Sequence, residues 1–288
     1  IAIVVAHLAK DIGIKVVMHS HTQPENIFLH MPNFFFVKKI NSLFYRYLVW
    51  LYKKTDIIIY PSEFSKKIFE EKFNTHLNNK VISNGVDINK FKKSNVPEEF
   101  TRRYDINKNN INLLYVGRLH PEKNIPTLIK SMSYVLKHKQ NIRLYIAGDG
   151  HLDSKLKKLV VSIGLGKHII FLGRVSDSDL IHAYNICNIF ILPSLAELEG
   201  MVVLEAMACG KPLLIADSEE SASVYLIKDN GFLFNPYSPI ELAQKIITLA
   251  NDKELLAKMS NNSLRLSREY DIEESVTNIE NIYYDLLR

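Results

Sequence analysis

A segment with two glutamates, Glu197 and Glu205, carries residues whose types and spacing suit a phosphorylated, hydroxyl-bearing ligand. A short apolar helix is expected to stop at Gly210, because glycine favours a helix C-terminus. The unpaired N–H groups at its start, near Gly200, attract phosphate oxygens, and carboxylates accept hydrogen bonds from hydroxyl groups. The structural alternative is that one glutamate caps the helix and the other lies on its surface. Glu205 lies in an apolar run, where a carboxylate is costly without a partner, so we favour binding.

Two cations, Arg118 and Lys123, follow the strand that we expect over residues 112–116. A helix is expected to begin after them, with Asn124 as its cap and Pro126 in its first turn. Ligands of open α/β sheets gather at the carboxyl ends of strands, and a guanidinium with an ammonium suits a diphosphate. The alternative is that both are solvated loop cations.

The elements that position these residues alternate along the chain. Short apolar runs rich in β-branched residues recur, each followed by an amphipathic stretch of helical length. This alternation predicts parallel sheets with crossover helices, an α/β doubly wound architecture. The expected strands cover residues 15–19, 57–60, 80–83, 112–116, 143–147, 168–172, 189–192 and 212–216, and the last helices cover 239–251, 253–270 and 272–287.

A polar stretch without a strong period, residues 91–110, indicates a domain boundary, which we place near residue 108. Residues 1–108 are then a partial Rossmann-like domain, and residues 109–269 a complete domain of the nucleotide-binding type. Residues 270–288 close the chain as an amphipathic helix.

Composition narrows the class of protein. Of 288 residues, 47% are hydrophobic and 23% charged, which excludes disordered, collagen-like and coiled-coil proteins. The net charge of +5 suits anionic ligands without indicating nucleic acid. The two cysteines exclude a disulfide framework, and no apolar stretch reaches the roughly 18–20 residues that cross a bilayer. The chain begins at Ile1 without a signal peptide, so we expect an N-terminally incomplete sequence of a cytoplasmic protein.

Five motifs in order resemble the retaining GT-B enzymes of glycosyltransferase family 4. They are ISNGVD at 82–87, GRLHPEKN at 117–124, AGDG at 147–150, FLGRVSDSDL at 171–180, and the two glutamates with EAMACGKP at 205–212. The resemblance implies a GT-B type fold, in which two Rossmann-like domains with parallel sheets face a cleft. The first domain would be partial and on the acceptor side, and the helix of residues 270–288 would cross back to it.

The resemblance implies a nucleotide-diphosphate sugar as donor. Arg118 and Lys123 match the family's diphosphate-binding pair. Glu197 matches the carboxylate that holds the sugar hydroxyls, and Glu205 the one that holds the ribose. His21 matches the histidine that many members set against the donor sugar. Catalysis is therefore assigned to Glu197, His21, Arg118 and Lys123.

Further donor contacts follow from the same resemblance. The backbone near Gly173 would meet the base, and the helix start near Gly200 the diphosphate. We expect His19 to point to the opposite face from His21 and to have a structural role. No cofactor is implied, and family members need no metal for this step. Besides the two cations, the donor-binding residues implied are Gly173, Arg174, Val175, Gly200, Met201, Val202 and Glu205.

Two departures from the family pattern concern the donor. Where many members carry a Gly-Gly pair, this chain has the sequence DSEESAS at residues 217–223. This segment resembles that of diacylglycerol glucosyltransferases. The Gly-rich first loop of the N-terminal domain, which usually approaches the donor phosphates, is absent. A nucleotide-sugar binder without turnover is therefore one alternative to an enzyme.

Aromatic residues gather over 28–36, and the helix expected over 38–54 has lysines at both ends. This pattern indicates an interfacial helix on an anionic membrane surface, with the protein peripheral on the inner face of the cell membrane. The alternative is a helix whose aromatics pack on the sheet of the first domain.

The function that the sequence favours is transfer of a hexose from UDP-glucose to an acceptor hydroxyl, with retention. The acceptor expected is a membrane lipid such as diacylglycerol, and the alternative is a polysaccharide or lipid-linked glycan. A glycan phosphorylase or a sugar-nucleotide epimerase is disfavoured, because neither carries this set of cations and glutamates.

Overall fold

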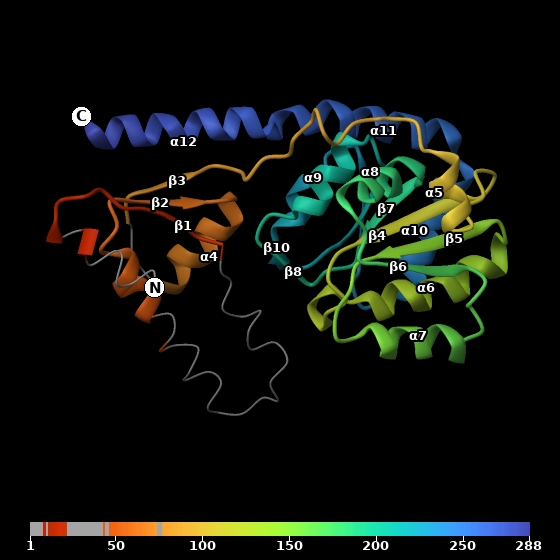
Figure 1. The fold of residues 1–288 in the computed structure, drawn as a ribbon. Helices are drawn as coiled ribbons and strands as arrows, with labels where there is room; N and C mark the ends of the chain where they lie inside the picture. The colour runs from red at the N-terminus through yellow and green to blue at the C-terminus, as the bar shows by residue number, and fades with distance from the viewer. Residues whose placement is uncertain (1–7, 10, 22–42, 44–45, 74–76) are drawn as a thin grey trace. The chain divides into compact units, whose positions relative to one another are not determined.

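The computed structural model describes residues 8–9, 11–21, 43, 46–73 and 77–288. The chain divides into two compact units. One consists of Val86–Asp271, and the other consists of Ile1–Gly85 together with Ile272–Arg288. Each unit has an α/β structure with a parallel sheet (Figure 1), so the α/β class expected from the sequence is confirmed.

A six-stranded parallel sheet forms the centre of the unit Val86–Asp271. Its strands are largely buried on both faces, which is why they read as continuous apolar runs in the sequence. Their order is β11-β9-β7-β4-β5-β6, which is the doubly wound order. The strands stay parallel, but the order in which successive strands are added to the sheet reverses between β4 and β7. The strands are β4 (Ile111–Val116), β5 (Ile142–Ala147), β6 (Ile169–Gly173), β7 (Ile189–Leu192), β9 (Leu213–Ala216) and β11 (Gly231–Phe234).

Helices cover both faces of this sheet (Figure 1). On one face α6 contacts α7 and α10, and on the other α9 contacts α11, with α8 nearby. Local sequence fixes the helix starts; the Ser176 hydroxyl, for example, caps α8 by accepting from Asp179 N at 3.1 Å. The helices are α6 (Ile125–His138), α7 (Asp153–Ser162), α8 (Asp177–Ile186), α9 (Met201–Ala208), α10 (Pro239–Asn251) and α11 (Lys253–Ser267).

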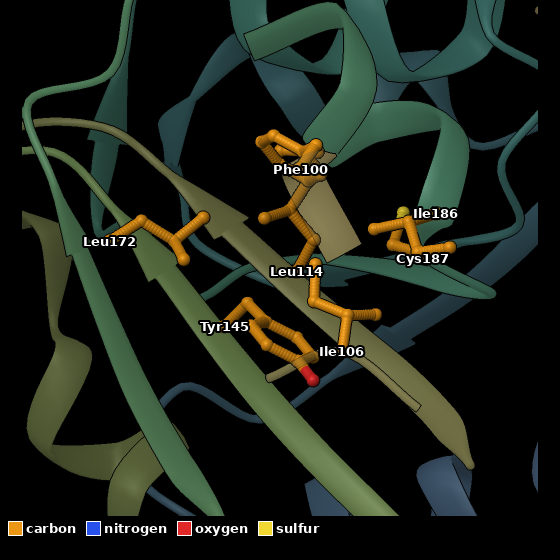
Figure 2. A pocket seen from close by; sticks show the side chains of 8 residues that line it. Phe100, Ile106, Leu114, Tyr145, Leu172, Ile186 and Cys187 are labelled. Carbon is orange, nitrogen blue, oxygen red and sulfur yellow. The ribbon is translucent and has the colours of Figure 1, made fainter. Parts of the chain in front are cut away.

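Helix α5 (Glu98–Arg103) also belongs to this unit, so the boundary lies at residues 85–86 and not near residue 108. Phe100 of α5 lines a small apolar hollow together with Leu114 of β4 and Tyr145 of β5 (Figure 2). Phe91 joins the same core. The stretch is polar overall and its few apolar residues have no period, so their contribution to the core was not visible in the sequence.

The other unit has a parallel sheet in the order β1-β2-β3, with β1 (Val17–His19), β2 (Ile57–Tyr60) and β3 (Asn79–Val81). Helix α4 (Glu63–Phe73) contacts β2. Helix α12 (Ile272–Leu287) groups with this unit, because Ile282 packs with Ile57 and Ile59 of β2.

The expected strands are confirmed to within two residues at either end. The strand β11 and the small sheet of β8 (Ala196–Glu197) with β10 (Glu220–Ser221) were not predicted. Strands of two residues are too short for a detectable alternation. Within the described part of the chain, none of the helices combines the length and the apolar character needed to span a bilayer.

Candidate active site

The candidate site lies at the carboxyl ends of β4 and β7, the two strands at the reversal point of the sheet. Arg118 and Lys123 follow β4, and Glu197 lies on β8, shortly after β7. The crevice outside such a reversal point is where open α/β sheets bind ligands. The fold therefore brings three of the predicted site residues to one place.

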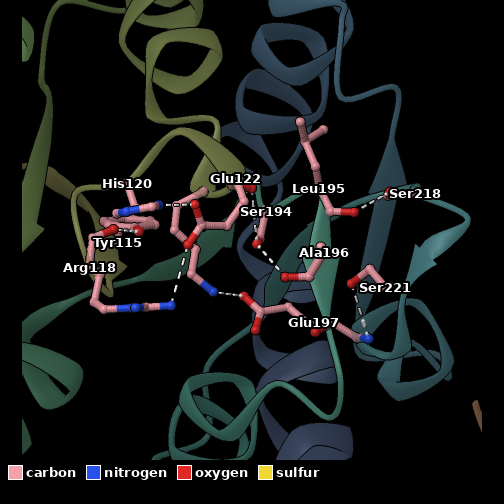
Figure 3. A network of polar contacts seen from close by, with 12 residues as sticks. Tyr115, Arg118, His120, Glu122, Ser194, Leu195, Ala196, Glu197, Ser218 and Ser221 are labelled. Atoms are coloured by element: carbon pink, nitrogen blue, oxygen red, sulfur yellow. Dashed lines mark hydrogen bonds and ion pairs between the residues drawn. The ribbon is translucent and has the colours of Figure 1, made fainter. Parts of the chain in front are cut away.

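An ion pair joins two of these residues. Lys123 Nζ lies 2.6 Å from Glu197 Oε1, and the two side chains are 13% and 15% exposed (Figure 3). The backbone of Glu197 is held because β8 pairs with β10, where Ser221 is its register partner. At this degree of burial each charge depends on the other for compensation.

A buried carboxylate that the sequence analysis missed, Glu122, lies beside this pair on the 3-10 helix η1 (Pro121–Lys123). It is 2% exposed, contacts His120 Nδ1 and lies 3.4 Å from Arg118 Nη2 (Figure 3). Burial raises the pKa of Glu122, but the hydrogen bond with His120 and the nearby Lys123 charge outweigh it, so the pKa lies below its usual value. The Arg118 side chain is 70% exposed, which leaves its guanidinium accessible to an anion.

Hydrogen bonds hold the loop between β7 and β8 to η1 and to the segment that follows β9. The Glu122 carbonyl oxygen accepts from Leu195 N at 2.7 Å, and the Ser218 hydroxyl donates to the Leu195 carbonyl oxygen at 2.5 Å. Figure 3 shows the bond between Leu195 and Ser218 and, beside it, the bond from the Ser194 hydroxyl to the Glu122 carbonyl oxygen. Glu122, Leu195 and Ser218 thereby form a hydrogen-bonded frame, which holds the backbone that carries the charged side chains in a fixed geometry.

Helix α9 begins beside this frame, with Gly200 at its N-cap in a left-handed conformation at φ +95°. The N-cap residue is a glycine without a side chain, so neither Glu197 nor Glu205 occupies the capping position given as the structural alternative. The N–H groups of Met201 and Val202 lie in the first turn, where a helix offers no internal acceptor. This helix start provides positive potential for an anion.

The variant Gly200→Ala is expected to lose stability for two reasons. Alanine in a left-handed conformation costs roughly 1–2 kcal/mol, and its methyl group would overlap the Ser223 hydroxyl. Gly164→Ala is the matched control, because Gly164 has φ +71° but nothing within 4 Å of the added methyl group. Urea unfolding measures both free energies. Equal losses would contradict the close packing of Ser223 on Gly200.

The second glutamate of the motif, Glu205, lies on α9 one turn further along. Its Oε2 accepts a hydrogen bond from the hydroxyl of Tyr184 at 2.7 Å. Burial raises the pKa of Glu205, while the Tyr184 hydrogen bond and the Lys90 charge oppose the shift. The partner that a carboxylate in an apolar run requires is therefore a tyrosine of α8.

The loop expected to meet a base follows β6. Gly173 ends this strand at φ +68°, and its carbonyl oxygen accepts from Gly148 N at 2.8 Å. Arg174 is exposed and Val175 half-buried. The loop lies at the same carboxyl edge as Arg118, two strands away, and its contact with a base stays a prediction.

Asn124 occupies the N-cap position of α6, but the side-chain cap that we expected is wrong. Its Nδ2 donates to the Pro236 carbonyl oxygen at 2.8 Å, and its Oδ1 accepts from the Thr127 hydroxyl at 2.9 Å. Its φ of 49° is left-handed, and none of the helix N–H groups donates to its side chain. Asn124 thereby ties the loop of Lys123 to that of Pro236.

His21 follows β1 in the other unit, where it is exposed. Its ring stacks on that of His19, with centroids 5.9 Å apart. The expectation of opposite faces was therefore wrong, because positions i and i+2 of an extended chain share a face. The role of His21 toward a donor sugar stays a prediction. Of the expected interfacial segment 28–54, residues 28–42, 44 and 45 lie outside the described part of the chain.

The fold is of the GT-B type, which solved glycosyltransferases share. HepE of Anabaena, in a crystal structure with UDP-glucose, superposes with a TM-score of 0.82 at 25% identity, over 99% of this chain and 76% of that chain. An uncharacterized glycosyltransferase of Methanocaldococcus jannaschii is 30% identical over 173 residues, 60% of this chain and 48% of the relative. The alpha-monoglucosyldiacylglycerol synthase of Streptococcus pneumoniae is 26% identical over 212 residues, 72% of this chain and 47% of the relative.

The chain belongs to the family of glycosyl transferases group 1, whose profile matches residues 96–265. The profile of glycosyltransferase family 4 matches residues 1–90, so the predicted resemblance to family 4 and the GT-B fold are confirmed. The chain spans about half the length of the curated relatives named above.

Proposed function

We propose that this chain transfers a hexose from a nucleotide-diphosphate sugar, with UDP-glucose favoured, to the hydroxyl of an acceptor. The observation that supports this proposal most is the ion pair of Lys123 with Glu197 beside the start of α9. It combines, at one edge of the sheet, a cation and a helix terminus for the diphosphate with a carboxylate for sugar hydroxyls.

The diphosphate would be bound by charge. Arg118, Lys123 and the N–H groups at the start of α9 stabilise the negative charge that grows on the leaving group as the bond to the sugar breaks. These groups neutralise the diphosphate with the chain's own charges. That the step needs no metal or cofactor stays a prediction.

In this scheme the Glu197 carboxylate can bind either the Lys123 ammonium or a hydroxyl of the donor sugar. A diphosphate next to Lys123 competes with the Glu197 carboxylate for the same ammonium. The pair weakens, and a carboxylate oxygen becomes available to a sugar hydroxyl. Glu197 would thus hold the sugar only when the diphosphate is bound.

Retention of configuration is part of the proposal and is implied by the family resemblance. The acceptor oxygen attacks the sugar carbon on the face that the diphosphate leaves. The bond from that carbon to the diphosphate oxygen breaks, and the departing oxygen takes the acceptor proton. His21 would lie against the donor sugar.

The acceptor that we propose is a membrane lipid of the diacylglycerol type, reached at the inner face of the cell membrane. The S. pneumoniae relative is named as a synthase of alpha-monoglucosyldiacylglycerol. In residues 46–54, Leu48 and Leu51 are buried, while Trp50 is 43% exposed with the Lys54 ammonium 4.4 Å from its ring centroid. This part of the segment therefore packs on its own unit and also presents an exposed aromatic–cationic rim.

A turnover assay tests the proposal. The chain is incubated with UDP-glucose or GDP-mannose and with either a short glycan or vesicles of diacylglycerol in neutral or anionic phospholipid, and released nucleotide diphosphate is measured. We expect UDP release that requires diacylglycerol and rises with anionic lipid. Release that depends on a short glycan instead would favour glycan synthesis. Nucleotide binding without release under every condition would favour a binder and contradict the enzyme.

A further inference from the structure

Tyr184 is a buried tyrosine of α8 whose hydroxyl reaches a carboxylate on the neighbouring helix. The residue has no exposed surface. Its hydroxyl lies 2.7 Å from Glu205 Oε2 and 3.2 Å from the Val202 carbonyl oxygen. A phenol has one proton to donate, and the shorter contact to a charged acceptor is the stronger hydrogen bond.

Aromatic packing fixes the position of this hydroxyl. The Tyr184 ring meets Phe91 edge-on, with centroids 5.9 Å apart at 82°, and lies 5.8 Å from the ring of Phe190 on β7. These neighbours come from the segment before α5 and from the central sheet. The ring cannot turn without opening the core, so the hydroxyl is a fixed donor.

The fixed donor sets the orientation of Glu205. With Oε2 tied to Tyr184, the carboxylate of Glu205 has one preferred rotamer, and Oε1 is the oxygen left for another donor. Lys90, which pairs with Asp177 at 2.7 Å, adds positive potential at this carboxylate. Burial and the Asp177 charge still raise the pKa of Glu205, so it is the hydrogen bond with Tyr184 that aims this carboxylate.

We propose that Tyr184 is a positioning residue for nucleotide binding, which acts by orienting Glu205 toward a hydroxyl of the donor's nucleoside. This inference rests on the proposed function and on the family resemblance, which implies that Glu205 holds the ribose of the donor. If Tyr184 only filled the core, its replacement by phenylalanine would leave the affinity for the nucleotide unchanged, because phenylalanine keeps the ring and removes only the hydroxyl.

Calorimetric titration with UDP and with GDP tests this inference in the wild type, Tyr184→Phe, Glu205→Ala and the double variant. We expect the Kd for UDP to rise about fivefold in Tyr184→Phe, because a hydrogen bond to a charged group is lost. In the Glu205→Ala background the same change is expected to alter the Kd less than about twofold, since the carboxylate it orients is gone. Tyr145→Phe, on β5, is the matched control for removing a buried phenol and is expected to bind UDP as the wild type does.

Steady-state kinetics give a second readout. Ribose contacts are made equally in the ground and transition states, so Tyr184→Phe should raise the KM for the donor and leave kcat unchanged. An unchanged Kd, or an equal loss of affinity with and without Glu205, would overturn the role of Tyr184 while wild-type binding of UDP upheld the proposed function. If the wild type binds neither UDP nor GDP, both proposals fail.

Discussion

Replacing Glu197 with glutamine is expected to reduce turnover by about 100-fold, because a sugar that is not held in a reactive orientation loses a factor of this size. The same variant is expected to bind UDP more tightly than the wild type. Glutamine removes the carboxylate that competes for the Lys123 ammonium, so the diphosphate meets an uncompensated cation. Turnover with UDP-glucose and titration with UDP measure the two effects.

The opposite signs of these two effects separate a catalytic role from misfolding. A misfolded variant would lose both UDP binding and turnover. Glu254→Gln, an exposed carboxylate in the first turn of α11, is the matched control and should change neither. Wild-type turnover by Glu197→Gln would refute the role that we assign to Glu197.

Replacing Lys123 with methionine is expected to raise the Kd for UDP about tenfold or more, because one charge-assisted contact to the diphosphate is lost. Stability should also fall, on the order of 1–3 kcal/mol, since Glu197 is left as a largely buried carboxylate without its partner. Calorimetry and urea unfolding measure the two changes. Lys130→Met is the control, because Lys130 is an exposed lysine on α6.

The double variant Lys123→Met, Glu197→Gln distinguishes binding from stability. Removing both charges leaves no unpaired carboxylate, so most of the stability should return, while UDP affinity should stay low. UDP binding that recovered together with stability would show that Lys123 supports the fold and does not bind the diphosphate.

The strands of the larger sheet were predictable because they are buried on both faces and read as apolar runs, such as Ile111–Val116 and Ile189–Leu192. The paired strands β8 and β10 were not, because each has two residues and depends on the other for its geometry. The boundary near residue 108 was wrong for a related reason. Phe100 joins the core by tertiary packing, which no local pattern signals.

The candidate site was predictable in outline. Arg118, Lys123 and Glu197 follow neighbouring strands, and the rule that parallel strands end at one edge brings them together. Their ion pairing depends on loop geometry that spacing does not specify. Glu122 and Tyr184 were missed because nothing in the sequence distinguishes a buried carboxylate next to a lysine, or a core tyrosine, from their exposed counterparts.

The central claim is that this chain binds a nucleotide chiefly through its diphosphate, at Arg118, Lys123 and the start of α9. Titration calorimetry with UDP and with uridine under the same conditions tests it most directly. The account predicts that UDP binds about 100-fold more tightly than uridine, since charge-assisted contacts to the phosphates supply most of the affinity. Equal affinities for UDP and uridine, or no binding of UDP, would contradict it.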